Sequence, residues 1–146
     1  MRYDPCMTEA VTYLNFDGNC REAMKFYVRC LGGELSLMPF SQVPGQNIPK
    51  EAKDRIMHAR ITKGSKILLM ASDTMPGMGA PFQKGNNFWI SLQCGSAEEV
   101  DRVFNALSEK GNVVMPVQQT FWSARFGMLT DQFGINWMFN FEKPQG

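Results

Sequence analysis

The sequence contains one histidine, so any chemistry that needs an imidazole depends on His58. Residues 56–62 alternate in a way that predicts a strand with His58, Arg60 and Thr62 on one face. On a cavity wall, an imidazole can serve as an acid, a base or a ligand anchor near neutral pH. The alternative is a strand histidine with a structural hydrogen bond, and the residues leave both open. Asp73 ends the next predicted strand, where it either orients His58 or caps the following loop; the cap is favoured.

Most other candidates are aromatic and come from residues 119–140, which predict two strands joined by a turn at 130–134. Such an aromatic hairpin either fills a core or forms the wall of a pocket that stacks flat, apolar ligands. Arg125 is either a solvated hairpin arginine or a pocket residue that stacks on a ring or binds a carboxylate or phosphate. The candidate ligand-binding residues are Trp122, Arg125, Trp137, Trp89, Tyr13 and Phe121.

Several functional classes are disfavoured by composition and motif. A formal net charge of +1, with no run of basic residues, argues against nucleic acid or an anionic membrane as a partner. No Ser/His/Asp or Cys/His nucleophile arrangement is visible, and the glycines at 77–79 lack the strand-to-helix context of a phosphate-binding loop.

The four cysteines, Cys6, Cys20, Cys30 and Cys94, show neither disulfide nor metal-ligand spacing. With eleven methionines beside them, they suit a reducing compartment in which buried thiols act as small hydrophobes. The first residues lack the apolar core of a signal peptide, and no apolar run is long enough to span a bilayer. We therefore expect a cytoplasmic protein that does not associate with membranes.

The pattern of elements repeats along the chain. The first half predicts a strand at 9–16, a helix at 20–31 ended by Gly32 and Gly33, and strands at 34–40, 55–62 and 66–72, with a mobile loop at 41–53. The second half predicts a strand at 87–94, a helix begun by a Ser96/Glu99 capping box, a strand at 112–117 and the aromatic hairpin. For the first helix, residues 17–19 supply the N-cap candidates.

These elements predict one α+β domain over residues 1–146, with module one at about 8–73, a connector at about 74–85 and module two at about 86–142. Each module has the order strand, helix, strand, strand, strand. Because a small sheet with one helix leaves its other face uncovered, we expect the two curved sheets to form a partly open barrel with a cavity.

Four segments together resemble the vicinal oxygen chelate superfamily, which includes glyoxalase I, bleomycin-resistance proteins and extradiol dioxygenases. They are residues 13–23, His58–Ala59 with 69–76, 120–127 and 131–138, and they most resemble the PhnB-like (YjdN-like) branch. That resemblance implies paired βαβββ modules, and a histidine like His58 is typical of the branch. The methyltransferase label sometimes given to it does not suit a chain without a doubly wound sheet or Gly-rich first turn.

The superfamily's enzymes hold a divalent metal with His and Glu ligands. By resemblance, the corresponding positions here are Ala10, Phe88 or Trp89, a residue within 67–70, and Met138, all of them apolar. We therefore expect no metal and no other cofactor.

Three functions follow as hypotheses. The first is a metal-independent protein that binds a small molecule in an aromatic cavity and works, by resemblance, as a homodimer. The alternative is a lyase, isomerase or dioxygenase that uses His58 with Asp73 or an atypical metal. The third is a structural or partner-binding module with filled pockets.

Overall fold

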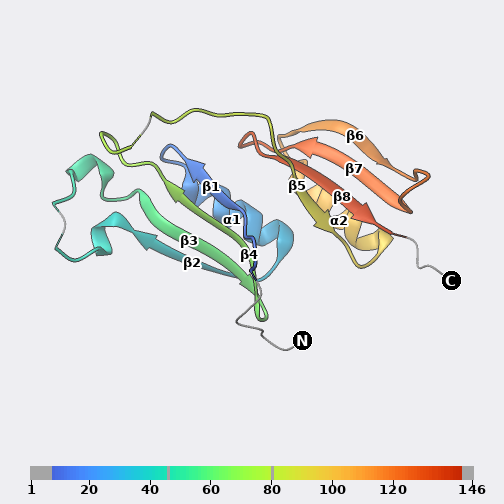
Figure 1. Cartoon of the computed structure of the whole chain (residues 1–146), viewed down its shortest axis with the longest axis horizontal. Helices are drawn as coiled ribbons and strands as arrows, with labels where there is room; N and C mark the ends of the chain where they lie inside the picture. The colour runs from blue at the N-terminus through green and yellow to red at the C-terminus, as the bar shows by residue number, and fades with distance from the viewer. Residues whose placement is uncertain (1–7, 46, 80, 143–146) are drawn as a thin grey trace. The chain divides into compact units, whose positions relative to one another are not determined.

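The computed structural model describes residues 8–45, 47–79 and 81–142, so Cys6 lies outside the described residues (Figure 1). The chain divides into two compact units, one of residues 1–28 and 32–82 and the other of 29–31 and 83–146. In chain order the elements are β1 (Tyr13–Phe16), α1 (Cys20–Leu31), β2 (Glu34–Pro39), the 3-10 turns η1 (Phe40–Gln42) and η2 (Lys50–Ala52), β3 (Ile56–Lys63), β4 (Lys66–Asp73), β5 (Ile90–Gln93), α2 (Ala97–Leu107), β6 (Asn112–Gln118), β7 (Arg125–Thr130) and β8 (Asn136–Phe141).

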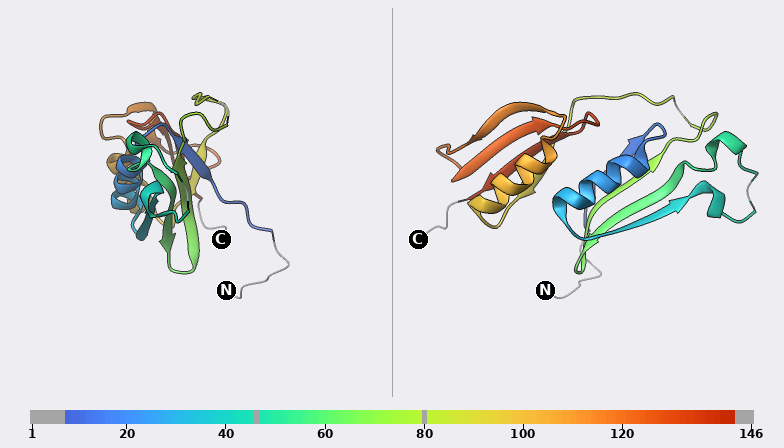
Figure 2. Two further views of the ribbon diagram at one scale, coloured as in Figure 1. Left: turned by 90° about the vertical axis from the view of Figure 1, so that its left-hand side faces the viewer. Right: turned by 180° about the vertical axis from the view of Figure 1, so that it is seen from behind.

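The first sheet has the strand order β1-β4-β3-β2, in which β1 runs parallel to β4 and the other neighbours are antiparallel. Helix α1 lies along one face of this sheet (Figure 2). Ala59, Ile61, Leu69 and Ala71 alternate along β3 and β4 and are all buried, as expected for the face that packs under a helix. We call the opposite side the helix-free face of the first sheet.

The second sheet repeats this arrangement with the order β5-β8-β7-β6 and a parallel β5–β8 pair. Helix α2 covers one face of this sheet (Figure 2), and the buried Trp137 and Phe139 of β8 lie on that face. Phe104 of α2 meets Phe139 edge to face, with ring centroids 5.2 Å apart. The other side is the helix-free face of the second sheet.

Both helices lie where periodicity predicts them. The bounds of α1 are as predicted, and its predicted apolar face is buried at Ala23, Phe26, Tyr27, Cys30 and Leu31. In α2, the Ser96 hydroxyl accepts a 3.1 Å hydrogen bond from the Glu99 amide, as the capping box predicts.

The strands differ at their edges. β1 begins at Tyr13 rather than Glu9, and β5 begins at Ile90 rather than Asn87. The first strand of the aromatic hairpin begins at Arg125, because Thr120 and Ser123 close a turn just before it: the Thr120 hydroxyl accepts from the Ser123 amide at 3.0 Å. The loop predicted at 41–53 also contains two short 3-10 turns.

The turn between β7 and β8 depends on a buried aspartate. Asp131 Oδ1 accepts hydrogen bonds from the amides of Phe133 and Ile135, at 2.8 and 3.1 Å. Gly134 takes a φ of 86°, a left-handed conformation that glycine adopts without strain. An Asx-type turn therefore fixes the register of this hairpin. In the described part of the chain, neither helix has the length and hydropathy to cross a bilayer.

Candidate functional site

His58 hydrogen-bonds to a tyrosine across the first sheet. The Tyr13 hydroxyl lies 3.2 Å from Nδ1 of His58, and the two rings are tilted by 30° with centroids 5.8 Å apart. Tyr13 is on β1 and His58 on β3, with β4 between them, so the phenol reaches over β4 to meet the imidazole. Tyr13 remains 43% exposed. The pair is thus a polar group on the helix-free face that a ligand can reach.

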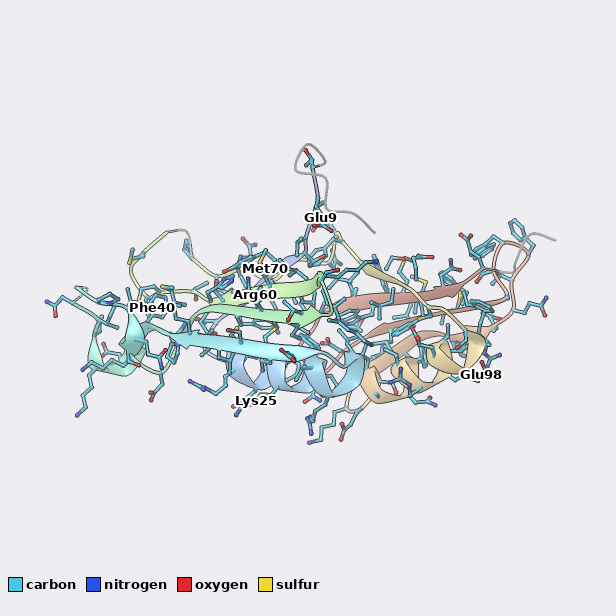
Figure 3. All side chains as sticks on the ribbon, turned by 90° about the horizontal axis from the view of Figure 1, so that it is seen from below. Glu9, Lys25, Phe40, Arg60, Met70 and Glu98 are labelled. Atoms are coloured by element: carbon cyan, nitrogen blue, oxygen red, sulfur yellow. The ribbon has the colours of Figure 1, made fainter. Side chains whose placement is uncertain are left out.

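Arg60 shares this face with His58, as the alternation of β3 predicts. It is exposed and pairs in register with Met70 of β4, which in turn pairs with Tyr13 of β1. In Figure 3, Arg60 and Met70 lie on neighbouring strands while Lys25 marks α1 beneath the sheet. Among the described residues, the Arg60 guanidinium has no carboxylate within salt-bridge distance. This face therefore combines a free cation, an imidazole, a phenol and a thioether.

Asp73 does not belong to that group. It is buried beside α1, and its carboxylate accepts hydrogen bonds from three backbone amides: Gly18 at 2.8 Å, Cys20 at 3.0 Å and Ile56 at 2.8 Å. Since Ala59 pairs with Ala71, Asp73 and His58 point to opposite faces of the sheet. Asp73 therefore caps the first residue of α1 and anchors the start of β3, and its position on the opposite face does not support the alternative role of orienting His58.

A pocket of about 410 Å³ lies beside the end of β4, lined by Asp17, Thr74, Met75, Pro76, Gly77, Met78, Gly79, Pro81 and Phe82. Asp17 accepts hydrogen bonds from Arg55 at 3.0 Å and from the Thr74 hydroxyl at 3.1 Å. The hydrogen bond from Arg55, and to a smaller extent that from Thr74, lowers the pKa of the Asp17 carboxyl below its usual value. Because Arg55 already neutralises the Asp17 carboxylate, Asp17 does not give this pocket an unpaired negative charge.

Trp137, predicted as a ligand-binding residue or a core residue, is a core residue. Its side chain is completely buried on the α2 side of β8, and its indole N–H donates to Asp131 Oδ2 at 2.8 Å. A buried tryptophan needs such a partner for its one polar atom. Of the two predicted interpretations of Trp137, its burial supports the core one.

Arg125 also lies on the α2 side of the second sheet. Its guanidinium Nε and one terminal nitrogen each lie 2.8 Å from Asp101 Oδ1, so the carboxylate of the helix already occupies it. The ion pair accounts for Arg125 on the α2 side of the sheet without a ligand, although its remaining N–H donors are not used by Asp101.

Phe121 and Trp122 occupy the tip of the turn between Thr120 and Ser123. Phe121 is 97% exposed and Trp122 is 52% exposed. Their rings meet edge to face at 4.7 Å, and Trp122 meets Phe126 of β7 at 5.6 Å. Trp89, the third tryptophan, is half-buried just before β5. The three tryptophans therefore have three different environments, and the tip of the turn is an exposed aromatic pair.

Sequence reasoning missed a chain of polar side chains on the helix-free face of the second sheet. The Gln93 amide donates to the Ser91 hydroxyl at 2.9 Å, and the Asn140 amide donates to Gln93 Oε1 at 2.8 Å. Asn140 Oδ1 is shielded from solvent and has no hydrogen-bond partner. We call Ser91, Gln93 and Asn140 the amide relay. A signal was present in the sequence: Ser91, Gln93 and Asn140 are uncharged polar residues that alternate with apolar residues along their strands.

The superfamily's metal site can be tested against the side chains of each module. Ala10 and Trp89 precede β1 and β5, whereas the residues that pair with Met70 and Met138 are Tyr13 and Ser91. A thioether, a phenol and a hydroxyl do not form the imidazole and carboxylate set that a hard divalent ion prefers. In the described residues, no three His, Cys, Asp or Glu side chains gather closely enough to hold a metal. The donor set does not fit the superfamily's metal.

Comparison with known proteins agrees with this architecture. The family model of the Glyoxalase/Bleomycin resistance protein/Dioxygenase superfamily matches residues 11–139, so the chain belongs to that superfamily. Within it the chain is YjdN- and PhnB-like: it is 35% identical to Protein YjdN of Escherichia coli (strain K12) over 143 residues, which are 91% of this chain and 95% of the relative.

Solved structures show the same fold. Protein PA1353 from Pseudomonas aeruginosa is 47% identical, with a TM-score of 0.82 over 93% of this chain and 98% of that one. A Bacillus cereus protein described as PhnB and as a 3-demethylubiquinone-9 3-methyltransferase is 25% identical, with a TM-score of 0.64 over 92% of this chain and 99% of that one. The predicted fold class, paired βαβββ modules of the glyoxalase type, is confirmed.

Proposed function

We propose that this protein binds a small organic anion with a flat, apolar part on the helix-free face of the first sheet, without a metal. The observation that supports this most is the hydrogen-bonded Tyr13–His58 pair beside the unpaired Arg60. A guanidinium presents a planar fork of donors that matches a carboxylate, and it has no competing carboxylate among the described side chains.

The geometry of the face supports an anion with an apolar body. His58 and Arg60 are two residues apart on β3, which places their Cα atoms roughly 6–7 Å from each other on one face. A carboxylate held by Arg60 therefore has a second donor or acceptor in the imidazole. Met70 and the Tyr13 ring supply apolar and aromatic surface next to them.

Benzoate is a suitable probe because it combines a carboxylate with a flat ring. Since His58 is the single histidine, its ring signals in a ¹H–¹³C NMR spectrum need no assignment. We expect benzoate to shift them saturably, with a dissociation constant on the order of 1 mM for so small a ligand. Arg60→Met should abolish this shift, and Arg60→Lys should retain part of it. An unchanged titration in Arg60→Met would refute the proposal.

A second candidate function is proton transfer by His58, as in an isomerase or lyase. It is favoured by the 3.2 Å contact between Tyr13 and Nδ1, because a hydrogen bond at one ring nitrogen fixes which tautomer the other presents. If Nδ1 donates to the phenol, Nε2 is left as a base.

Phenylpyruvate in D₂O tests that function. Nε2 would remove a proton from the carbon next to the keto group. The C–H electron pair would form the C=C bond of an enolate while the carbonyl π pair moves to the keto oxygen, and return of a solvent-derived deuteron to that carbon would restore the keto group. We expect wild type to accelerate deuterium incorporation above the buffer rate and His58→Gln not to. Equal rates in both proteins would leave binding without proton transfer as the function.

A further inference from the structure

The 410 Å³ pocket lies where the two parallel strands of the first sheet end, and its lining contains none of the residues proposed to bind an anion. Phe16 of β1 and Asp73 of β4 pair in register at the ends of these strands, so the residues that follow them, Asp17 and Thr74, leave the sheet side by side. Every lining residue belongs to the first compact unit. The volume is in the range of sites that bind small organic molecules.

A turn of four consecutive residues forms one wall of the pocket. In the segment Met75-Pro76-Gly77-Met78, the Met78 amide donates to the Met75 carbonyl at 3.1 Å, and Gly77 has a φ of 81°. Proline at the second position and a left-handed glycine at the third are typical of a type II β-turn. The wall is therefore set by the local sequence and does not need a ligand to form.

Much of the remaining lining is apolar. Five of the lining residues carry apolar side chains: Met75, Pro76, Met78, Pro81 and Phe82. Met78 is 70% exposed, so a ligand in the pocket would remove part of an apolar surface from water. Thioethers adapt to ligands of different shape and make favourable contacts with rings, and a phenylalanine ring offers stacking. This lining suits an aromatic ligand.

Asp17 supplies the polar end of the pocket. Its Oδ1 accepts from Arg55 at 3.0 Å and from the Thr74 hydroxyl at 3.1 Å, whereas no side chain or amide of the described residues donates to Oδ2. The Asp17 side chain is 55% exposed, so a ligand can reach Oδ2. The carboxylate repels an anion, and the Arg55 guanidinium beside it opposes a second cation. A neutral ligand that donates a hydrogen bond is therefore favoured.

We propose that this pocket binds a neutral aromatic alcohol, such as a phenol. The phenol hydroxyl donates to Asp17 Oδ2, and the ring lies against Met78 and Phe82. A hydrogen bond to an ionised acceptor is stronger than one between neutral groups, so a single such bond can orient the ligand. This site shares no residue with the anion-binding face and differs from it in the charge of its ligand.

Two probes of similar size test the proposal. 4-Ethylphenol has the donating hydroxyl, and 4-ethylanisole has a methyl group in place of its proton. The readout is the methionine methyl region of a ¹H–¹³C spectrum, in which the Met75 and Met78 signals are identified by their absence from Met75→Leu and Met78→Leu. 4-Ethylphenol should shift both signals saturably, and 4-ethylanisole should bind at least five-fold more weakly. Unmoved signals up to the solubility limit, or equal affinity for the two probes, would overturn the proposal.

Variants test the two ends of the pocket. Asp17→Asn should weaken 4-ethylphenol binding at least five-fold and leave 4-ethylanisole binding unchanged, whereas Phe82→Ala should weaken both. Phe121→Ala is the matched control, because it removes an exposed ring outside the pocket. If Asp17→Asn fails to fold, Phe82→Ala decides, since it keeps the ion pair of Asp17 with Arg55.

Wild-type affinity for 4-ethylphenol in the folded variants would refute the site. The response of the His58 signals to benzoate is scored separately, so failure of this proposal and failure of the proposed function are distinguishable.

Discussion

The Tyr13 hydroxyl lies 3.2 Å from Nδ1 of His58 although the two residues are on strands separated by β4. Adjacent strands are about 4.8 Å apart, so the two side chains together span roughly 10 Å of sheet to make this contact. The hydrogen bond orients an imidazole that remains accessible on the face away from α1. The pairing explains how one histidine can be held in a defined position without an aspartate to orient it.

Removing this hydrogen bond should change ligand binding more than stability. In Tyr13→Phe, we expect benzoate affinity to fall about five-fold, because a hydrogen bond of this kind contributes roughly 1 kcal/mol. The urea midpoint should barely change, since Tyr13 is 43% exposed. Isothermal titration and urea unfolding provide the two measurements. An unchanged benzoate affinity would show that the Tyr13–His58 contact does not organise the binding face.

Asp73 should be a major contributor to stability. Asp73→Ala leaves the amides of Gly18, Cys20 and Ile56 without their acceptor, at roughly 1–3 kcal/mol for each buried group. We expect a loss of about 3–5 kcal/mol in the free energy of unfolding, measured by urea denaturation. Asp54→Ala is the matched control, because Asp54 is exposed. A change no larger than that of the control would contradict the capping role.

Gly127 permits a close approach between β7 and α2. A Cβ atom there would lie 2.9 Å from a ring carbon of Phe104 and 3.0 Å from a methyl of Val117. We expect Gly127→Ala to destabilise by about 1–3 kcal/mol through overpacking. Gly95→Ala serves as control, since no atom lies within 4 Å of its added Cβ. Combining Gly127→Ala with Phe104→Leu should recover part of the loss; no recovery would mean that the ring is not the obstacle.

Cys20 should be unreactive in the native state. Burial, with the nearby Asp73 charge, raises the pKa of its thiol from 9.0 to about 12. At a pH below both values, the reactive thiolate is then about 10³-fold rarer than in the unfolded chain. Because the folded pKa is the higher one, the stability that this thiol contributes is full below pH 9 and is lost as the pH rises from there toward 12. Mass-spectrometric mapping of iodoacetamide labelling with and without urea tests this; equal labelling rates would contradict it.

Substitution of Arg125 should affect benzoate binding less than substitution of Arg60, because Asp101 already pairs with Arg125. Arg125→Gln breaks the partly exposed ion pair with Asp101, which we expect to cost about 0.2–1 kcal/mol of stability. Benzoate affinity should stay unchanged in this variant. Loss of benzoate binding in Arg125→Gln, measured by the same titration as for Tyr13→Phe, would instead support the predicted pocket role of Arg125.

Local patterns predicted most of the fold because each module consists of short-range elements. The apolar period of residues 20–31 gives α1, and Ser96 with Glu99 gives the start of α2. The cap of α1 could not be predicted from local sequence. The Cys20 amide donates to Asp73, which lies 53 residues further along the chain. Residues 17–19 supplied a plausible local cap, yet Asn19 makes no side-chain capping bond.

The candidate site was predictable only in part. Strand alternation correctly placed His58 and Arg60 on one face, but it could not show that Tyr13 reaches His58 across β4. Aromatic composition left both a core and a pocket open for Trp137, because composition does not separate core rings from pocket rings. Trp137 is buried with Asp131, while Phe121 and Trp122 are exposed at a turn. The amide relay went unnoticed because Ser, Gln and Asn on a strand resemble ordinary solvent-facing residues.

The most direct test of the proposed function is the benzoate titration of the His58 ring signals in the wild-type protein and in Arg60→Met. The account predicts a saturable shift in the wild type that Arg60→Met abolishes. It would be contradicted if benzoate left the His58 signals unmoved at tens of millimolar, or if Arg60→Met shifted them with the wild-type affinity.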